Sequence, residues 1–175
     1  MAQIKIQDLR PGDYAGMPPS TWWEKWICHA EGCKTFHWIW MVRPVNENGK
    51  RIDFITSESI EKGTALTRLD GRKVMIWRLK GDPIINPDDI IDIHAEFGNL
   101  PYSMGMNIWS GIWYLAKHYF GKVIPFIKFE GVNCLYWVDL GSLHMGIDLV
   151  PGDPDYIMQL DLEQSSLLQY VGELN

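Results

Sequence analysis

The residue best placed to do chemistry is Cys134, which begins a stretch whose apolar residues have helical spacing. Leu135, Val138 and Leu140 fit one face of a short helix, and Gly146 is suited to end it. A cysteine in the first turn lies beside unpaired N–H groups and the positive end of the helix dipole, which favour a thiolate over a thiol. This position predicts a nucleophile. The alternative is a buried apolar side chain, because free cysteine is among the most buried residue types.

A nucleophilic thiol needs a base, usually an imidazole, and a polar group that orients the imidazole. Of the five histidines, only His37 lies inside a clearly predicted strand, residues 35–42. Glu58 ends the next predicted strand, across a hairpin turn at Asn48-Gly49, so it could orient His37. Each has a structural alternative: His37 as a hydrogen-bonded core residue, and Glu58 as a solvent-facing carboxylate at a sheet edge.

The segment 28–37 offers a different chemistry, because it contains the potential zinc ligands Cys28, His29, Cys33 and His37. Its Cys-x₄-Cys spacing, with His37 four residues later, only approximates that of structural zinc sites. A small zinc-binding module here would also compete with catalysis, since His37 cannot readily serve both roles. For the catalytic interpretation we expect no metal and no other cofactor.

The elements that must position these residues change in character along the chain. Short strands at hairpin spacing predict an antiparallel sheet over residues 35–79. Helices are predicted over 22–31, 87–97, 107–119, 134–146 and 155–162, with an extended return over 121–129. The predicted fold class is α+β, with the antiparallel sheet from the N-terminal half packed against helices mainly from the C-terminal half. Residues 1–175 are predicted to form a single domain, in which 163–175 are a polar tail without an assigned role.

Composition limits the partners and the compartment. The chain has 175 residues, 46% of them hydrophobic and 22% charged, which is ordinary for a globular protein. A formal net charge of −6 argues against a nucleic-acid partner. No apolar run has the length of a transmembrane segment, and no signal peptide is recognisable. A cytoplasmic location is therefore the default, which leaves open export by another route or association with a virion. The oligomeric state is not predicted.

Tryptophan is unusually abundant, with nine residues in the chain. One interpretation is an apolar cleft for substrate, walled by Trp22, Trp23, Trp26 and Trp38. The other is a core rich in large side chains.

Several stretches between Asp8 and about Met158 occur in the order found in one family. They are DLRPGDYAG at 8–16, TFHWIWMV at 35–42, ESIEKGTALTRLD at 58–70, VMIWRLK at 74–80, GNLPYSMG at 98–105 and NCLYWVDLGSLHMGIDL at 133–149. In this order they resemble the circularly permuted branch of the NlpC-type papain-fold cysteine hydrolases, which includes relatives of lecithin retinol acyltransferase. The spacing from Cys134 to Gly146 and from Glu58 to Gly63 also matches the family pattern.

The resemblance implies a permuted papain-like fold in which Cys134 is the nucleophile, His37 the imidazole and Glu58 the third polar group. It also implies that Tyr102 helps the Cys134 N–H bind an oxyanion; as an alternative, Tyr102 anchors its loop to the core. The implied activity is hydrolysis of an amide or ester acyl bond through a thioester acyl-enzyme. The implied substrate is a peptide or an acyl compound, such as a cell-wall peptide or a lipid.

The chain departs from the family pattern around both catalytic positions. Leu135 and Tyr136 replace the Ser and Glu that follow the family's Cys, and Phe36 replaces the Ser before its His. Ile39 replaces a Gly on the same strand. These changes alter the expected shape of the substrate pocket. They leave a second possible function, a catalytically inactive relative that acts as a structural or binding protein.

Overall fold

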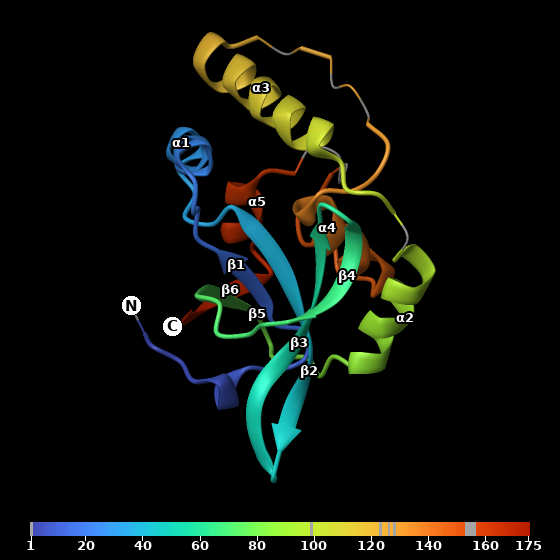
Figure 1. Ribbon diagram of the computed structural model, residues 1–175. Coiled ribbons are helices and arrows are strands. Elements are labelled where there is room, and N and C mark those ends of the chain that lie inside the picture. The colour runs from blue at the N-terminus through green and yellow to red at the C-terminus, as the bar shows by residue number, and fades with distance from the viewer. Residues whose placement is uncertain (1, 99, 123, 126, 128, 153–156) are drawn as a thin grey trace.

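The computed structural model describes residues 2–98, 100–122, 124–125, 127, 129–152 and 157–175. Its fold is α+β, as predicted, with a six-stranded antiparallel sheet and, in the described part of the chain, five α-helices (Figure 1). The strands are β1 (Tyr14–Met17), β2 (His37–Glu47), β3 (Lys50–Ile60), β4 (Gly63–Arg68), β5 (Val74–Leu79) and β6 (Leu168–Leu174). The helices are α1 (Trp22–Glu31), α2 (Pro87–Phe97), α3 (Met104–Phe120), α4 (Cys134–His144) and α5 (Gln159–Glu163), with a 3₁₀ turn at Ile6–Asp8.

The two longest strands, β2 and β3, form the hairpin that the sequence predicts. Asn48 and Gly49 both have positive φ, 48° and 75°, which is the requirement of a type I′ turn. Between this turn and the other end of the hairpin the pairing shifts register twice, between Val45 and Asn46 and between Met41 and Arg43, and Ile39 lies opposite Glu58. The full strand order is β4-β3-β2-β1-β5-β6.

The polar tail, residues 163–175, for which no secondary structure was predicted, contains a strand of the sheet. Residues 168–174 form β6, which pairs antiparallel with β5 from Leu168 opposite Leu79 to Leu174 opposite Val74. The sheet therefore combines the N-terminal half with the extreme C-terminus, and both ends of the chain lie near this edge (Figure 1).

The helical predictions were confirmed for α2 and α4, and α3 extends beyond the predicted range at both ends. The predicted helix over 155–162 is shorter, because α5 begins at Gln159; residues 153–156 lie outside the described part. The predicted extended return over 121–129 includes the undescribed positions 123, 126 and 128, and its described residues form no strand. Within the described residues, no helix is long and apolar enough to cross a membrane.

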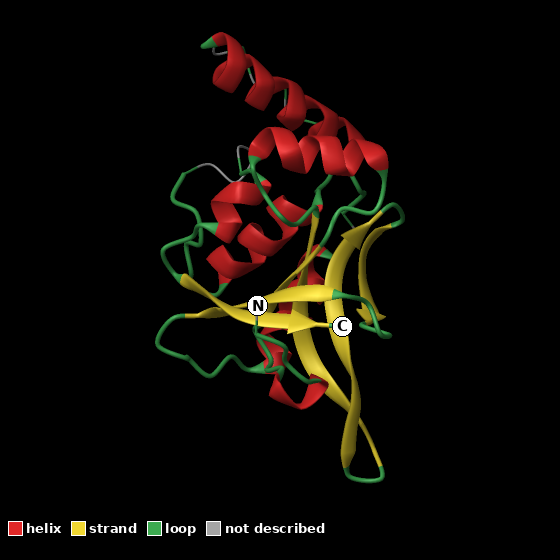
Figure 2. Ribbon diagram, turned by 90° about the vertical axis from the view of Figure 1, so that its left-hand side faces the viewer, coloured by secondary structure: helices red, strands yellow, loops and turns green. Residues whose placement is uncertain are grey.

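The sheet separates two apolar cores, because alternate residues of β2 point to opposite faces. Trp38, Trp40 and Val42 lie on the face covered by α2 and α4, where they meet helix residues such as Ile90 and Val138. Ile39 and Met41 pack on the other face with residues such as Phe54 and Ile76. The helices gather on one side of the strands, and α3 lies beyond the sheet (Figures 1 and 2).

Helix α4 approaches β2 closely at a glycine. A Cβ on Gly141 would lie 2.4 Å from the Trp40 ring, so only glycine allows this distance. The close contact fixes the helix that begins with Cys134 against the strand that begins with His37.

Candidate active site

Cys134 is the first residue of α4, as predicted, and its side chain is almost fully buried. The helix starts here because the Asn133 side chain accepts a hydrogen bond from the N–H of Tyr136, at 2.8 Å. Burial of the thiol would raise its pKa, but the charge and hydrogen bond of His37 and the N–H groups of Trp38 and Leu135 outweigh it. The pKa of Cys134 is therefore lowered, which favours the thiolate.

His37 and Glu58 come from adjacent strands and form an ion pair. Because Ile39 is opposite Glu58, His37 lies diagonally across from Glu58 on the same face of the sheet. Its Nε2 is 3.0 Å from Glu58 Oε2, and the glutamate side chain is only 3% exposed. The structural alternative for Glu58, a solvent-facing edge carboxylate, is therefore wrong.

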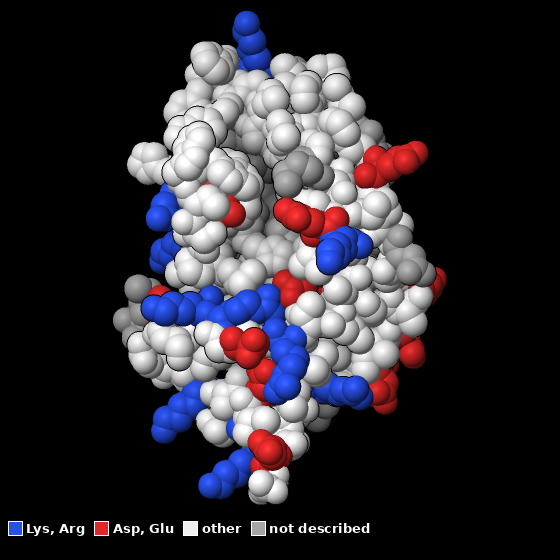
Figure 3. Space-filling view, viewed as in Figure 1, with Lys and Arg blue, Asp and Glu red and all other residues white. Residues whose placement is uncertain are grey.

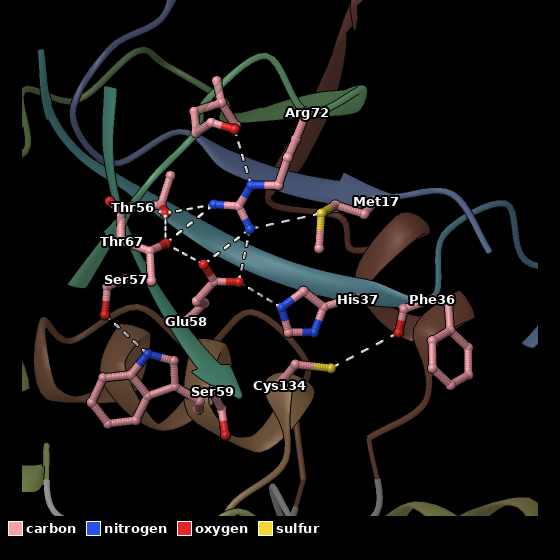
Figure 4. Close-up of polar contacts among 12 residues, drawn as sticks. Met17, Phe36, His37, Thr56, Ser57, Glu58, Ser59, Thr67, Arg72 and Cys134 are labelled. Carbon is pink, nitrogen blue, oxygen red and sulfur yellow. Dashed lines mark hydrogen bonds and ion pairs between the residues drawn. The ribbon is translucent and has the colours of Figure 1, made fainter. Parts of the chain in front are cut away.

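The imidazole lies between the carboxylate and the thiol. Its Nε2 is engaged by Glu58, and its other ring nitrogen, Nδ1, is on the side of Cys134 (Figure 4). Burial works against protonation of His37. The charge and hydrogen bond of Cys134, together with those of Glu58, more than compensate, and they raise the pKa of His37 to about 9. The three groups thus favour a thiolate next to an imidazolium.

Glu58 is itself held by residues that the sequence did not single out. The Arg72 guanidinium places Nη1 2.9 Å from Oε1 and 3.0 Å from Oε2, and the Thr67 hydroxyl donates to Oε1 (Figure 4). Burial would raise the carboxyl pKa, but these partners and His37 lower it to about 2. Glu58 is therefore ionised throughout the range in which His37 titrates.

Arg72 in turn has partners for all of its guanidinium nitrogens. Nε donates to the carbonyl of Leu69, and Nη2 donates to the hydroxyls of Thr56 and Thr67 and to the carbonyl of Arg68. A guanidinium fixed in this way presents Nη1 to Glu58 in one orientation. The sequence indicates the Asp70-Gly71 turn before Arg72, but it does not indicate where the Arg72 side chain points.

Tyr102 lines the same cavity as Cys134, a location that the family resemblance implies. Its segment runs beside the residues before α4, because Val132 N–H donates to the carbonyl of Pro101 and Ser103 N–H donates to that of Val132. Asn107 Nδ2 donates to the Tyr102 hydroxyl at 2.5 Å, which leaves the hydroxyl hydrogen available for another acceptor. Burial and the neighbouring Cys134 raise the pKa of Tyr102 to about 12, so it stays a donor.

A small cavity of about 30 Å³ connects these groups. Cys134, His37, Tyr102 and Asn107 line it, together with the buried polar residues Glu31 and Gln159, which the sequence did not indicate. A larger hollow of about 370 Å³ opens on the other side of His37 and Tyr102, toward Ser20 and Glu61. Figure 3 shows a hollow on this face of the molecule, below a surface over α3 that carries few charged groups.

The predicted tryptophan wall is only partly correct. Trp22, Trp23 and Trp26 of α1 do line an apolar groove of about 490 Å³ against Ile108 and Ile112 of α3. Trp23 also borders the hollow beside His37 and packs edge-on against Phe36, with ring centroids 4.9 Å apart. The prediction for Trp38 was wrong: it is fully buried and packs on Trp77 at 4.7 Å, because it follows His37 and points to the opposite face of β2.

The residues of the alternative zinc module do not converge. The thiols of Cys28 and Cys33 both approach the carbonyl oxygen of Thr35, at 3.3 and 3.4 Å, while His37 is paired with Glu58 and His29 is exposed. Across the described part of the chain, no group of three or more His, Cys, Asp and Glu side chains is placed to hold a metal ion.

Comparison with known proteins gives a fold relationship alone. No protein-family model and no curated protein matches the sequence. Among solved structures, the chain is similar to the metalloprotein yiiX from Escherichia coli O157:H7, a DUF1105 protein, with a TM-score of 0.62 and 12% identity. The similarity covers 94% of this chain and 97% of the other. At this identity the similarity concerns the α+β fold, so the function has to be argued from the site.

Proposed function

We propose that this protein is a cysteine hydrolase that cleaves an amide or ester acyl bond. The observation that carries the proposal is the array of Cys134, His37 and Glu58, with the imidazole between a helix-terminal thiol and a buried carboxylate. Catalytic arrays of this kind consist of a nucleophile, a base and a group that orients the base. An ordinary core histidine or a buried structural cysteine does not require the other two groups.

We also propose that the fold is the permuted papain-like arrangement that the sequence resembles. In support, the strands carrying His37 and Glu58 precede the helix carrying Cys134, and α4 packs on both β2 and β3. In this arrangement the nucleophile lies at the N-terminal end of a helix rather than in a loop.

The chemistry follows from the positions of the groups. The Cys134 thiolate attacks the acyl carbonyl, and His37, protonated on Nδ1, gives its proton to the leaving amine or alcohol. The N–H of Cys134 and the hydroxyl of Tyr102 bind the oxyanion; one such donor lowers the barrier by about 3–4 kcal/mol. A thioester acyl-enzyme results, and His37 then activates a water molecule, or another acceptor, that releases the acyl group.

The test is to trap the acyl-enzyme with a reactive ester such as p-nitrophenyl butyrate. We expect a burst of one p-nitrophenolate per protein molecule and, by mass spectrometry, a butyryl thioester on Cys134. The Cys134→Ala variant is expected to show neither, and Cys33→Ala, which removes a thiol outside the site, to show both. No acylation of Cys134 in the folded protein would favour the alternative function, a binding protein that has kept the fold.

A further inference from the structure

Large apolar side chains gather on the exposed sides of α1 and α3, at the end of the molecule beyond the sheet (Figure 1). Trp22 and Trp26 of α1 are 81% and 53% exposed, and Ile108 and Ile112 of α3 are 60% and 44% exposed. These four residues, called the α1–α3 face below, wall the apolar groove of about 490 Å³. The exposed Ile84 lies outside it. Contiguous exposed apolar surface of this kind marks an interaction site.

The spacing of these residues separates the exposed side of each helix from its folded side. Trp22 and Trp26 are four residues apart, as are Ile108 and Ile112, so each pair lies on one side of its helix. On the opposite sides, Cys28 of α1 and residues 106 and 110 of α3 are buried. Both helices are therefore anchored by other residues, which leaves the α1–α3 face available for a further contact.

The groove leads to the candidate active site. Ile27, Asn107 and Gly111 line both the groove and the small cavity that contains Cys134. Trp23 borders the groove and also the hollow beside His37. A partner that covers the groove would therefore lie next to the nucleophile.

The charges on these helices differ from those of the whole chain, whose formal net charge is −6. Helix α3 contains no Asp or Glu over its 17 residues, and the exposed Lys122 follows it. On α1, Lys25 is exposed, whereas the Glu24 carboxylate accepts hydrogen bonds from the N–H groups of Ser20 and Thr21. The surface over α3 carries few charged groups (Figure 3). Among the side chains that the structure describes on the two helices, the exposed Asp, Glu, Lys and Arg residues are therefore all lysines.

This combination of side chains selects a lipid surface as the partner. Tryptophan is enriched at the boundary between headgroups and acyl chains, because its ring is apolar and its N–H is polar. A lysine at the edge of an apolar face reaches the phosphates of anionic lipids through its long side chain. A second copy of this chain fits less well, since a symmetric contact would bring the lysines of both copies together.

We propose that the α1–α3 face docks on the surface of a membrane that contains anionic phospholipid. The four apolar side chains enter the boundary between headgroups and acyl chains, and Lys25 lies at the phosphates. The inference goes beyond the proposed function and does not depend on it, because it uses the exposed residues of two helices and none of the catalytic groups.

The test measures binding of the full chain to vesicles by flotation in a density gradient. One set of vesicles contains phosphatidylcholine alone, and the other contains equal parts of phosphatidylcholine and phosphatidylglycerol. We expect tighter binding to the second set. That preference should disappear in about 1 M NaCl, where the Debye length is about 3 Å. This readout needs no variant.

Matched substitutions at exposed positions locate the contact. Ile108→Ser should weaken binding by at least about fivefold, because less apolar surface leaves water. The same change at Ile84, which is 99% exposed outside the groove, should have no effect. Lys25→Gln should weaken binding by about fivefold, and only to the anionic vesicles. Lys50→Gln, at an exposed position of the β2–β3 turn, is its control.

Three results would overturn the inference. The first is the absence of binding to both sets of vesicles. The second is binding that Ile108→Ser and Ile84→Ser weaken equally or not at all. The third is a dimer in sedimentation velocity that Ile108→Ser dissociates, without vesicle binding, which would identify a second copy as the occupant. Acylation of Cys134 is measured without vesicles, so none of these results bears on the proposed function.

Discussion

The ionised state of a single carboxylate, Glu58, controls the charge of the candidate site. Arg72 and Thr67 hold it on one side and His37 on the other, while burial opposes its charge. Glu58 stabilises the protonated form of His37, and protonated His37 stabilises the Cys134 thiolate. By keeping Glu58 ionised, Arg72 therefore influences the Cys134 sulfur without contacting it. Arg72 is a positioning residue.

Replacing Arg72 tests whether it affects the reactivity of Cys134 through Glu58 and His37. In Arg72→Gln, the pKa of Glu58 should rise from about 2 toward its usual value, by about 1–2 units. A Glu58 carboxyl with a higher pKa becomes neutral at a higher pH. Once neutral, it no longer stabilises the protonated form of His37. The pH below which Cys134 loses its reactivity toward iodoacetamide should therefore rise.

The matched control is Arg68→Gln, which removes an arginine at the end of β4 whose side chain pairs with Asp53 instead of Glu58. Its profile should match that of the unaltered protein. If Arg72→Gln also leaves the profile in place, Arg72 does not influence the site through Glu58.

At the scale of elements, the site depends on how closely α4 packs against β2. Gly141 lies about two helical turns after Cys134 and allows the Trp40 ring to approach the helix backbone. A methyl group at this position would force the helix away from the strand. Because Cys134 and His37 belong to these two elements, the displacement would also separate the thiol from the imidazole.

We therefore expect Gly141→Ala to lower the free energy of unfolding by about 1–3 kcal/mol and to slow alkylation of Cys134 at pH 6. The control is Gly111→Ala on α3, where the added Cβ meets no atom within 4 Å. There, the higher helix propensity of alanine should leave stability unchanged or raise it by up to about 1 kcal/mol. Urea unfolding curves measure both variants, and equal effects would show that the close contact is unimportant.

For the whole molecule, Asp139 reduces stability at neutral pH. It lies on α4 with no solvent exposure, and burial, followed by the charge of Asp148, raises its pKa from 3.8 to about 6. In the unfolded chain the Asp139 carboxyl ionises at a lower pH than in the folded protein. Above that lower pH, ionisation of Asp139 therefore favours the unfolded state. Stability should thus fall between about pH 4 and pH 6 and remain reduced above that range.

Asp139→Asn should remove this loss. The raised pKa corresponds to about 3 kcal/mol, so the variant should gain up to that amount in the free energy of unfolding at pH 8 and little at pH 4. Asp92→Asn, on an exposed position of α2, should show no such pH-dependent gain. Parallel pH profiles for Asp139→Asn and the unaltered protein would contradict the role assigned to Asp139.

Much of the site could be predicted because its key residues lie in local patterns. The apolar spacing and Asn133 mark the start of α4 at Cys134, and the Asn-Gly turn indicates that β2 and β3 are adjacent antiparallel strands. Those signals bring Cys134, His37 and Glu58 into consideration without knowledge of the packing.

The rest depended on contacts between distant segments. Arg72, Glu31 and Gln159 come from a turn and from the ends of two helices, and no local pattern indicates where their side chains point. Trp38 was misassigned because the alternation of β2 places it on the opposite face from His37. The strand β6 was missed because Gly172 interrupts its strand-forming residues Tyr170 and Val171, and because its partner β5 lies far away in the sequence.

The central claim is that Cys134 is a thiolate maintained by His37, and its alkylation by iodoacetamide from pH 5 to 9 tests this most directly. The adducts on Cys28, Cys33 and Cys134 are located by mass spectrometry, with unfolded protein as a reference. An ordinary thiol with a pKa of about 8.5 is only about 0.3% ionised at pH 6. We predict rapid labelling of Cys134 at that pH and a loss of about 100-fold in His37→Ala. If Cys134 instead labels as slowly as Cys28 and Cys33 in both proteins, and gains reactivity only as an ordinary thiol ionises, the catalytic assignment is contradicted.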